Sequence, residues 1–313
     1  MNPSTDPAQS GAIQENVIWA KKIDFWLMRD SHTTFLTNNG MVMSFFKGVA
    51  SKYEVKSFTT RGIILRNYDK RAPNSFGEPQ FLDLPSEPFD MTQNKAVNIR
   101  VDEEDMVYGS RVLSGGRVLG RFMREVFTPY RDEYIIDKIY QKGVEDSEGR
   151  VTTVNVFEGQ TGAVDGNPSI YEQMVRDRSR MSNYVLGRHN MRNVVVLVPE
   201  SNYAIIELDK RFSRDNEVAQ KMVVFEGQVS KLGGLRIFPI PDEYFDNRVQ
   251  YIFTAMDIVA APYHIQYSKV HRNTPDFQGD LAQMRTLWDA HITKIGSQRI
   301  RVCRTDNANV RPA

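Results

Sequence analysis

The sequence predicts an α+β fold, in which strands and helices follow one another without the regular alternation of a doubly wound sheet. Two observations lead to this prediction. The alternating apolar residues Val97, Ile99 and Val101 indicate a strand, and apolar residues spaced by three and four between Val118 and Val126 indicate a long helix. The 313 residues are 41% hydrophobic and 25% charged, which is an ordinary globular balance for one elaborated domain or two.

Composition excludes several classes of protein. Lys plus Arg number 40 and Asp plus Glu number 39, so no global charge draws the chain to nucleic acid. The single cysteine, Cys303, excludes an intrachain disulfide and a multi-cysteine zinc site, and fits a reducing compartment. No apolar run reaches the roughly 18 residues of a membrane-spanning helix. Residues 1–16 lack the pattern of a signal peptide and are expected to form a flexible arm.

The first hundred residues change character twice. Residues 13–29 carry the spacing of a loosely amphipathic helix. Residues 41–66 are rich in β-branched and aromatic residues, and predict strands in a long hairpin or extended loop. Residues 67–90 hold four prolines and little periodicity, so a long irregular segment is expected, which is unusual inside a domain and often functional.

The middle of the chain predicts one dominant helix. The strand at 97–101 is followed by the acidic residues 102–105, which suit a helix N-terminus. The helix is expected over 104–141, with a break near Gly115 and a start or kink near Pro129. We expect it to pack against the sheet that holds residues 298–304. Its inner face is expected to comprise Val118, Leu119, Phe122, Met123 and Val126.

The second half mixes strands with shorter helices. A strand is predicted over 150–159, and a helix over 167–187, where Asn167 caps it, Pro168 opens it and Gly187 ends it. A buried strand from residue 193 turns at Pro199 into a short helix. Strands are expected over 222–241, joined through Gly233-Gly234, and over 250–262. Residues 280–295 are expected to begin as a helix and to end as a strand. Residues 298–304 are expected to form an amphipathic edge strand with Arg299, Arg301 and Cys303 on one face.

Motifs of catalysis are absent from the sequence. There is no phosphate-binding loop, dinucleotide-binding glycine motif, zinc-protease helix or nucleophile elbow. His264 and His271 could share a metal ion, although ordinary surface or hydrogen-bonded histidines are the favoured interpretation. The acidic residues 102–105 could bind a cation, although a solvated helix start explains them better. We therefore expect no catalytic residue, cofactor or metal site.

Several stretches, in their order and spacing, resemble the major capsid proteins of tailed bacteriophages, which have the Hong Kong 97-like fold. In that family a strand ends in an acidic cluster and a long spine helix follows, and an extended E-loop precedes both. The matching residues here are Val55–Ser57, Gly62–Leu65, Tyr68–Lys70, Val101–Asp105, Arg124, Val126–Pro129, Asp132–Tyr134, Gly227–Pro241 and Asp289–Lys294.

The resemblance implies a coat protein that assembles into the icosahedral shell enclosing the double-stranded DNA of a tailed phage. Its implied partners are further copies in hexamers and pentamers, portal and scaffolding or decoration proteins, and packaged DNA on the inner surface, with no membrane. The implied location is the virion, with assembly in the host bacterial cytoplasm. The implied divisions are an N-terminal arm (1–39), the E-loop with flanking strands (40–100), a P-domain with the spine helix (101–184), an A-domain (185–275), and a return to the P-domain with a C-terminal tail (276–313).

Two segments are expected to contact neighbouring subunits. One is the charged and aromatic stretch of the E-loop, and the other follows the stiff exit Pro239-Ile240-Pro241, where proline lowers the entropy lost on assembly. The expected contact residues are Arg66, Tyr68, Asp69, Arg71, Asp242, Glu243, Tyr244 and Phe245. The alternatives are an encapsulin-like nanocompartment shell, a hydrolase with a dispersed site formed by His264, Asp289 and His291, and a nucleic-acid-binding module.

Overall fold

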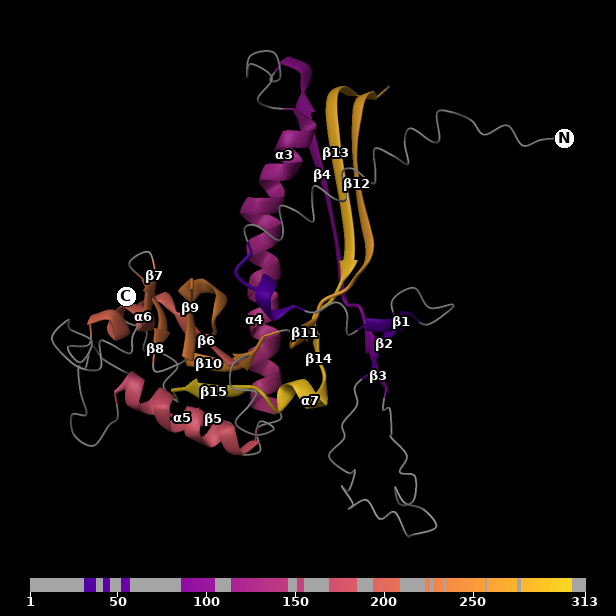
Figure 1. Ribbon diagram of the computed structural model, residues 1–313. Helices are drawn as coiled ribbons and strands as arrows, with labels where there is room; N and C mark the ends of the chain where they lie inside the picture. Colours follow the sequence, from indigo (N-terminus) through magenta and orange to yellow (C-terminus); the bar gives the residue numbers. More distant parts are fainter. Residues whose placement is uncertain are drawn as a thin grey trace, which may run out of the picture.

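The computed structural model describes these stretches of the chain: residues 31–37, 42–45, 52–56, 86–104, 114–145, 151–154, 169–184, 194–208, 223–225, 228–232, 235–256, 258–274 and 277–305. Figure 1 shows a body built around one sheet and an arm that rises from it, in which a helix runs beside long strands. The expected helix at 13–29 lies outside the described residues.

The body contains a seven-stranded sheet. Its central strand pairs, β10 with β6 and β15, are antiparallel, whereas β6 pairs with β9 and β15 with β5 in parallel. The strands in spatial order are β5 (Val151–Thr153), β15 (Arg301–Arg304), β10 (Val249–Ala255), β6 (Val194–Pro199), β9 (Leu235–Ile240), β8 (Gln228–Leu232) and β7 (Val223–Phe225). The expected hairpin through Gly233-Gly234 is confirmed as β8 and β9.

Helices cover both faces of the body sheet. Alternate residues of β6 enter two separate cores, Val195 and Leu197 on one face and Val194, Val196 and Val198 on the other. Helix α4 (Thr128–Glu145) packs on the first face. Helices α5 (Ile170–Tyr184) and α6 (Glu200–Leu208) pack on the second. Because both faces are covered, β6 reads as a continuous apolar run rather than an alternating one.

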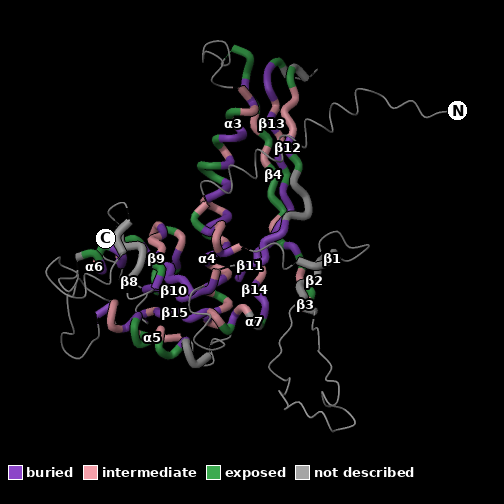
Figure 2. Tube along the Cα trace, in the orientation of Figure 1, coloured by how far each residue is buried: buried purple, intermediate pink, exposed green. Residues whose placement is uncertain are grey.

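The arm is a three-stranded antiparallel sheet with a helix on one face. Strand β13 (Phe277–Trp288) lies between β12 (Tyr263–Thr274) and β4 (Gln93–Asp102), and α3 (Gly115–Phe122) covers the sheet. Every second residue of β13 points inward, namely Asp280, Ala282, Met284, Thr286 and Trp288. In Figure 2 most of β13 is coloured as buried.

Residues 280–295 were expected to begin as a helix, and this expectation is wrong. Ala282 and Met284 have good helix propensity, but β13 is paired on both sides, and its two neighbours decide its conformation. The expected domain boundary between residues 275 and 276 falls at the turn of the β12–β13 hairpin, whose two strands belong to one sheet.

The spine helix is continuous from Gly115 to Glu145. Helix α3 passes into a π-helical segment, η3 (Met123–Phe127), and then into α4. Thr128 donates its hydroxyl proton to the carbonyl oxygen of Met123 at 2.8 Å. Pro129 has no N–H and its ring excludes the carbonyl four residues earlier, which favours a widened turn just before it. This is the irregularity expected near Pro129.

The widened turn changes which residues face inward. Leu119 and Met123 are buried as expected, and Phe122 is half-buried, but Val126 is 53% exposed and Phe127 takes the inner position instead. The π-helical turn holds one residue more than an α-helical turn, so every later inner position moves by one. The expectation for Val126 is therefore wrong.

The two halves of the spine helix pack on different sheets. Helix α3 lies against β13 and β4 of the arm, whereas α4 packs on the sheet that holds residues 298–304. The expected packing is therefore confirmed for the second half of the helix and wrong for the α3 stripe. The approach of α4 is close, because a Cβ atom on Gly143 would lie 2.7 Å from methyl groups of Ile300 and Val302. Strand β15 is also interior rather than an edge, and both Arg301 and Cys303 are buried.

A small projecting sheet leaves the base of the arm. It has the order β1 (Val42–Phe45), β2 (Lys52–Lys56) and β3 (Ser86–Asp90), all antiparallel, which confirms the expected hairpin. Residues 86–90 were expected to be irregular, and they are a strand because they pair with β2 along its whole length. Near this base lie the strand pair β11 (Val259–Ala260) and β14 (His291–Ile292), and the short helix α7 (Lys294–Ser297).

The predicted start of one helix moves slightly. Helix α5 begins at Ile170, where the hydroxyl of Ser169 accepts a hydrogen bond from the backbone N–H of Glu172 at 3.3 Å, as an N-cap does. The expected cap Asn167 lies outside the described residues.

Among the described helices, none combines the length and apolar character needed to cross a membrane.

Candidate assembly site

Asp289 ties three segments together where the projecting sheet meets the body. Its carboxylate accepts hydrogen bonds from the backbone N–H of Thr92 at 2.9 Å and from the Thr92 hydroxyl at 2.7 Å. The same carboxylate accepts from the hydroxyl of Tyr134 and from the backbone N–H of Ala290, each at 2.7 Å. The chain between β3 and β4 is therefore fixed to α4 and to the end of β13.

The protonation states of this cluster match its hydrogen bonds. Burial, with a further contribution from Asp289, raises the pKa of Tyr134 to about 12, so the phenol remains a donor at neutral pH. Burial alone would raise the pKa of Asp289, but hydrogen bonds from Tyr134 and Thr92 outweigh it, and the pKa is lowered. Asp289 is therefore an ionised acceptor with its lone pairs in use.

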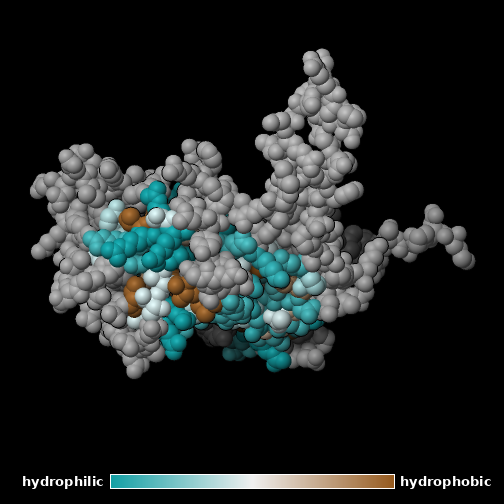
Figure 3. Space-filling model, turned by 90° about the horizontal axis from the view of Figure 1, so that it is seen from below, coloured by the Kyte–Doolittle hydropathy of each residue, from teal (hydrophilic) through white to brown (hydrophobic). Residues whose placement is uncertain are grey.

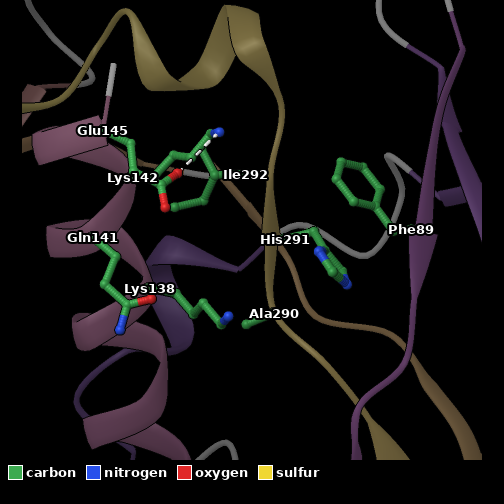
Figure 4. Close-up of a pocket in the computed structure, with 8 residues that line it drawn as sticks. All are labelled: Phe89, Lys138, Gln141, Lys142, Glu145, Ala290, His291 and Ile292. Atoms are coloured by element: carbon green, nitrogen blue, oxygen red, sulfur yellow. Dashed lines mark ion pairs between the residues drawn. The ribbon is translucent and has the colours of Figure 1, made fainter. Parts of the chain in front are cut away.

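A pocket lies beside this cluster, between α4 and β14 (Figure 4). Its volume is about 150 Å³. The ring of His291 stacks on Phe89 of β3, with centroids 4.2 Å apart, and its Nε2 is 3.7 Å from Asp289 Oδ2. Lys142 forms an ion pair with Glu145 at 3.6 Å. The remaining lining residues are Lys138, Gln141, Ala290 and Ile292.

The base of the projecting sheet is held at a second point. The carboxylate of Glu87 in β3 accepts hydrogen bonds from the backbone N–H of Lys294, at the start of α7, with both oxygens at 3.3 Å.

Burial lowers the pKa of His291, and nearby Lys138 lowers it further, against the opposing effect of Asp289. The imidazole at this base is thus held in its neutral form, which suits stacking on Phe89.

Asp132 fixes the chain where it emerges from residues 1–30. The carboxylate accepts hydrogen bonds from the Ser31 hydroxyl at 2.7 Å, the His32 backbone N–H at 2.7 Å and the Thr33 hydroxyl at 2.6 Å. Leu36 follows three residues later and is fully buried in the core beside α4. This segment is therefore attached to the spine helix by both polar and apolar contacts.

Asp280 secures the far end of the spine helix. Its Oδ2 accepts a hydrogen bond from the backbone N–H of Gly115 at 2.9 Å, which satisfies one free donor of the first helical turn. A Cβ atom on Gly115 would lie 2.9 Å from both Asp280 Cβ and Val270 Cγ1. Glycine at this position allows helix and sheet to approach closely enough for the bond.

The buried side chain of Arg301 in β15 has an ion-pair partner in Asp177. Arg301 Nε lies 3.0 Å from Asp177 Oδ1, and Arg301 also donates to the hydroxyl of Thr152 at 2.7 Å. The hydroxyl of Tyr251 donates to Asp177 Oδ2 at 2.8 Å, and burial raises the pKa of this phenol well above its usual value. The network joins α5 to three strands of the body and is structural.

The expected contact residues have different fates. Arg66, Tyr68, Asp69 and Arg71 lie outside the described residues. Residues 242–244 form a short 3₁₀ turn, in which Glu243 is exposed and Asp242 accepts a hydrogen bond from the backbone N–H of Ser201 at 3.2 Å. Phe245 is buried in the subunit's own core at 6% exposure, because the chain folds back onto α4 after β9. Its ring is used within the subunit.

The geometry argues against the two metal sites considered in the sequence analysis. His264 and His271 are seven residues apart in β12, so about 23 Å of strand separates them and they cannot share a metal ion. Within the described residues no group of three potential ligands could hold a metal. Asp102 accepts a hydrogen bond from the backbone N–H of Glu104 at 2.9 Å, as expected of a helix start.

The proposed hydrolase site also lacks its parts. Asp289 and His291 lie close together, but the carboxylate is engaged with Thr92 and Tyr134, and the pocket lining contains no serine, threonine or cysteine. Figure 3 shows the underside of the molecule, where the described surface is mostly hydrophilic and hydrophobic residues form small separate groups. The distinctive feature of the described structure is a set of three aspartates, Asp132, Asp280 and Asp289, each of which accepts hydrogen bonds from a segment remote in sequence. We call these residues the anchors.

A body with a helix-and-sheet arm and a projecting sheet at its base is the Hong Kong 97-like fold of phage capsid proteins, and solved structures of that class match this chain. A chain in the procapsid of satellite phage P4, which includes the size determination protein, superposes with a TM-score of 0.56 at 11% identity, covering 93% of this chain and 92% of that one.

Two further structures give the same result. A chain from Mycobacterium phage Bobi matches with a TM-score of 0.54 at 10% identity, covering 89% of this chain and 91% of that one. A chain from the mature capsid of bacteriophage PhiM1 matches with a TM-score of 0.53 at 11% identity, covering 87% of each. No family model and no curated protein matches the sequence. At such identities the likeness establishes the fold.

Proposed function

We propose that this chain is the major capsid protein of a tailed bacteriophage and that it assembles into the icosahedral shell around a double-stranded DNA genome. The observation that carries the proposal is the capsid fold, shared over nearly nine-tenths or more of both chains with phage procapsid and mature capsid structures. Closed shells form when many copies reuse the same interfaces under symmetry.

The anchors support a subunit that holds its neighbours through extended segments. Such segments transmit force to the body only if their bases are fixed. Asp289 and Glu87 fix the base of the projecting sheet, and Asp132 fixes the chain leading from residues 1–30. The partners we propose are further copies in hexamers and pentamers, a portal, scaffolding or decoration proteins, and packaged DNA. The proposed location is the virion, after assembly in the host cytoplasm.

The chain has no enzymatic role in this proposal. The buried ionisable groups are engaged in packing: Asp177 pairs with Arg301, and Asp289 binds Thr92 and Tyr134. A catalytic carboxylate needs access to a substrate, whereas Asp177 and Asp289 are almost completely buried. The proposed contacts with neighbouring subunits stay the two expected segments, residues 66–71 and 242–245, and within the second segment Glu243 is exposed.

The test is assembly of the purified protein, followed by sedimentation and negative-stain electron microscopy. Closed shells, or hexamers and pentamers, are expected. A variant in which residues 60–83 are replaced by a short Gly-Ser linker should keep the melting transition of the body but form no shells. A small soluble oligomer of the parent protein under all conditions would overturn the proposal, and shells that enclose protein cargo would favour the nanocompartment.

A further inference from the structure

The pocket between α4 and β14 has two unlike walls. Lys138 and Lys142 line it from α4, and because they are four residues apart they lie on the same side of the helix. The other wall is formed by the stacked rings of His291 and Phe89, together with Ile292. The pocket therefore places a cationic side opposite an aromatic and aliphatic side (Figure 4).

The ammonium group of Lys138 forms no ion pair with any residue that the structure describes. Its Nζ lies over the ring of Tyr134, 5.3 Å from the centroid. The adjacent Asp137 feels the charge of Lys138, but its carboxylate accepts a hydrogen bond from Gln141 at 2.6 Å. In Figure 4 the Lys138 side chain extends from α4 toward Ala290. Its donors are therefore available to a ligand in the pocket.

The other charged groups near the pocket are engaged or neutral. Lys142 pairs with Glu145 at 3.6 Å. The carboxylate of Asp289 is held by the donors described above and is 1% exposed. Burial and the charge of Lys138 lower the pKa of His291, so its ring is uncharged at neutral pH. Lys138 thus supplies the net positive charge of the lining.

This lining favours one class of ligand. A single ammonium group matches a carboxylate, with which it forms a short charge-assisted hydrogen bond. A phosphate group carries about two charges at neutral pH and suits forked arginine donors, and the lining contains no arginine. The volume of about 150 Å³ is comparable to that of a cavity that holds one benzene molecule. The stacked rings and Ile292 suit a ligand with an apolar body of that size.

We propose that this pocket is a binding site for a carboxylate carried on a small aromatic or aliphatic body, with Lys138 binding the carboxylate and the Phe89–His291 stack contacting the body. Two sources have this chemistry, a free organic acid and an acidic side chain of a second copy of the chain. The site itself is inferred from the pocket alone, and only the second source rests on the proposed function.

The experiment titrates the purified, unassembled protein with para-fluorobenzoate and measures binding by the broadening of the fluorine NMR signal of the ligand. The parent should bind this acid. Lys138→Met keeps the length and the apolar stem of the side chain but removes its charge, and should weaken binding about 10- to 100-fold. The uncharged analogue para-fluorobenzyl alcohol should bind the parent as weakly as the variant binds the acid.

The matched control is Lys95→Met. The Nζ of Lys95 also lies over a tyrosine ring of α4, 5.1 Å from the centroid of Tyr130, but Lys95 does not line the pocket. This variant should bind para-fluorobenzoate like the parent. The assignment is wrong if the parent does not bind the acid, or if Lys138→Met binds it as tightly as the parent. If Lys138→Met melts early, the parent alone decides, since equal binding of the acid and the alcohol would overturn the proposal.

Assembled shells distinguish the two sources. If an acidic side chain of a second copy fills the pocket, para-fluorobenzoate should bind the unassembled protein but not the shells. If a free acid is the ligand, shells and unassembled protein should bind it alike. A protein that forms no shells would refute the proposed function, and the carboxylate site would still be tested by the titration of the soluble protein.

Discussion

At Asp289 a single side chain satisfies donors from three different segments. The two hydrogen bonds from Thr92, the one from Tyr134 and the one from Ala290 all end on one carboxylate that is 1% exposed. Removing the acceptor would leave the buried N–H of Ala290 and the part-buried donors of Thr92 and Tyr134 without this partner, and a fully buried donor left in this way costs about 1–3 kcal/mol. We therefore expect this single side chain to contribute more to the stability of the fold than its small size suggests.

Asp289→Ala should therefore lower the free energy of unfolding by about 2–4 kcal/mol, since one buried donor and three part-buried donors lose their acceptor. Urea unfolding of monomers or capsomers measures this loss. Glu243→Ala removes a carboxylate from an exposed position and should change stability by less than about 0.5 kcal/mol. Equal stability of the two variants would contradict the anchoring role of Asp289.

His291 makes the same region sensitive to pH. Its pKa is lowered below the ordinary value of 6.5, mainly by burial and also by Lys138, while Asp289 and Asp90 act in the opposite direction. Below pH 6.5 the unfolded chain binds a proton that the folded chain resists, so stability falls as the pH falls. His291→Gln should flatten this dependence between pH 7 and pH 5. The measurement is the melting temperature at several pH values, and an unchanged slope in the variant would refute it.

The strands and the helix of the arm show which sequence patterns predict secondary structure correctly. The alternation at Val97, Ile99 and Val101 predicts β4 correctly because one face of that strand is buried. Residues 280–288 contain helix-favouring Ala282 and Met284, and their conformation is set by pairing with strands remote in sequence, which a local pattern does not reveal. Likewise the exposed Val126 follows from a π-helical turn that shifts the face of an otherwise regular helix.

The shifted face of the spine helix makes a direct prediction. Met123→Ala removes a fully buried side chain and should cost about 2–5 kcal/mol, whereas Val126→Ala at a 53% exposed position should cost less than about 0.5 kcal/mol. Chemical denaturation of both variants distinguishes them. If Val126→Ala proves the more damaging, the inner face is the one expected from a regular helix, and the described turn is wrong.

On the scale of the whole molecule, the anchors join positions far apart in the chain. Thr33 is 99 residues from Asp132, Gly115 is 165 from Asp280, and Thr92 is 197 from Asp289. A lone aspartate has no local signal that marks such a role, so the site was not predictable, whereas the motif order along the chain sufficed for the fold. Asp132 and Asp289 both stand in stretches that resemble the capsid family, but nothing in those stretches indicates their hydrogen-bonding partners.

Truncation tests the N-terminal anchor. Removing residues 1–12 should leave the body as stable as the parent, because the polar composition of that stretch cannot support a core. Removing residues 1–37 should destabilise it, since it takes away the partners of Asp132 and empties the site of Leu36, at a cost of about 3 kcal/mol or more. Cooperative melting of both truncated proteins gives the comparison. Loss of the transition in the shorter truncation would contradict this assignment.

Strand β15 has a further consequence for the order of events during synthesis. It lies between β10 and β5, and β5 pairs with β15 alone among the described strands. Residues 151–153 must therefore wait for residues 301–304, which leave the ribosome about 150 residues later, before they can join the sheet. At about 5–20 residues per second this delay is on the order of ten seconds. A growing chain cannot complete the sheet of its body during that interval.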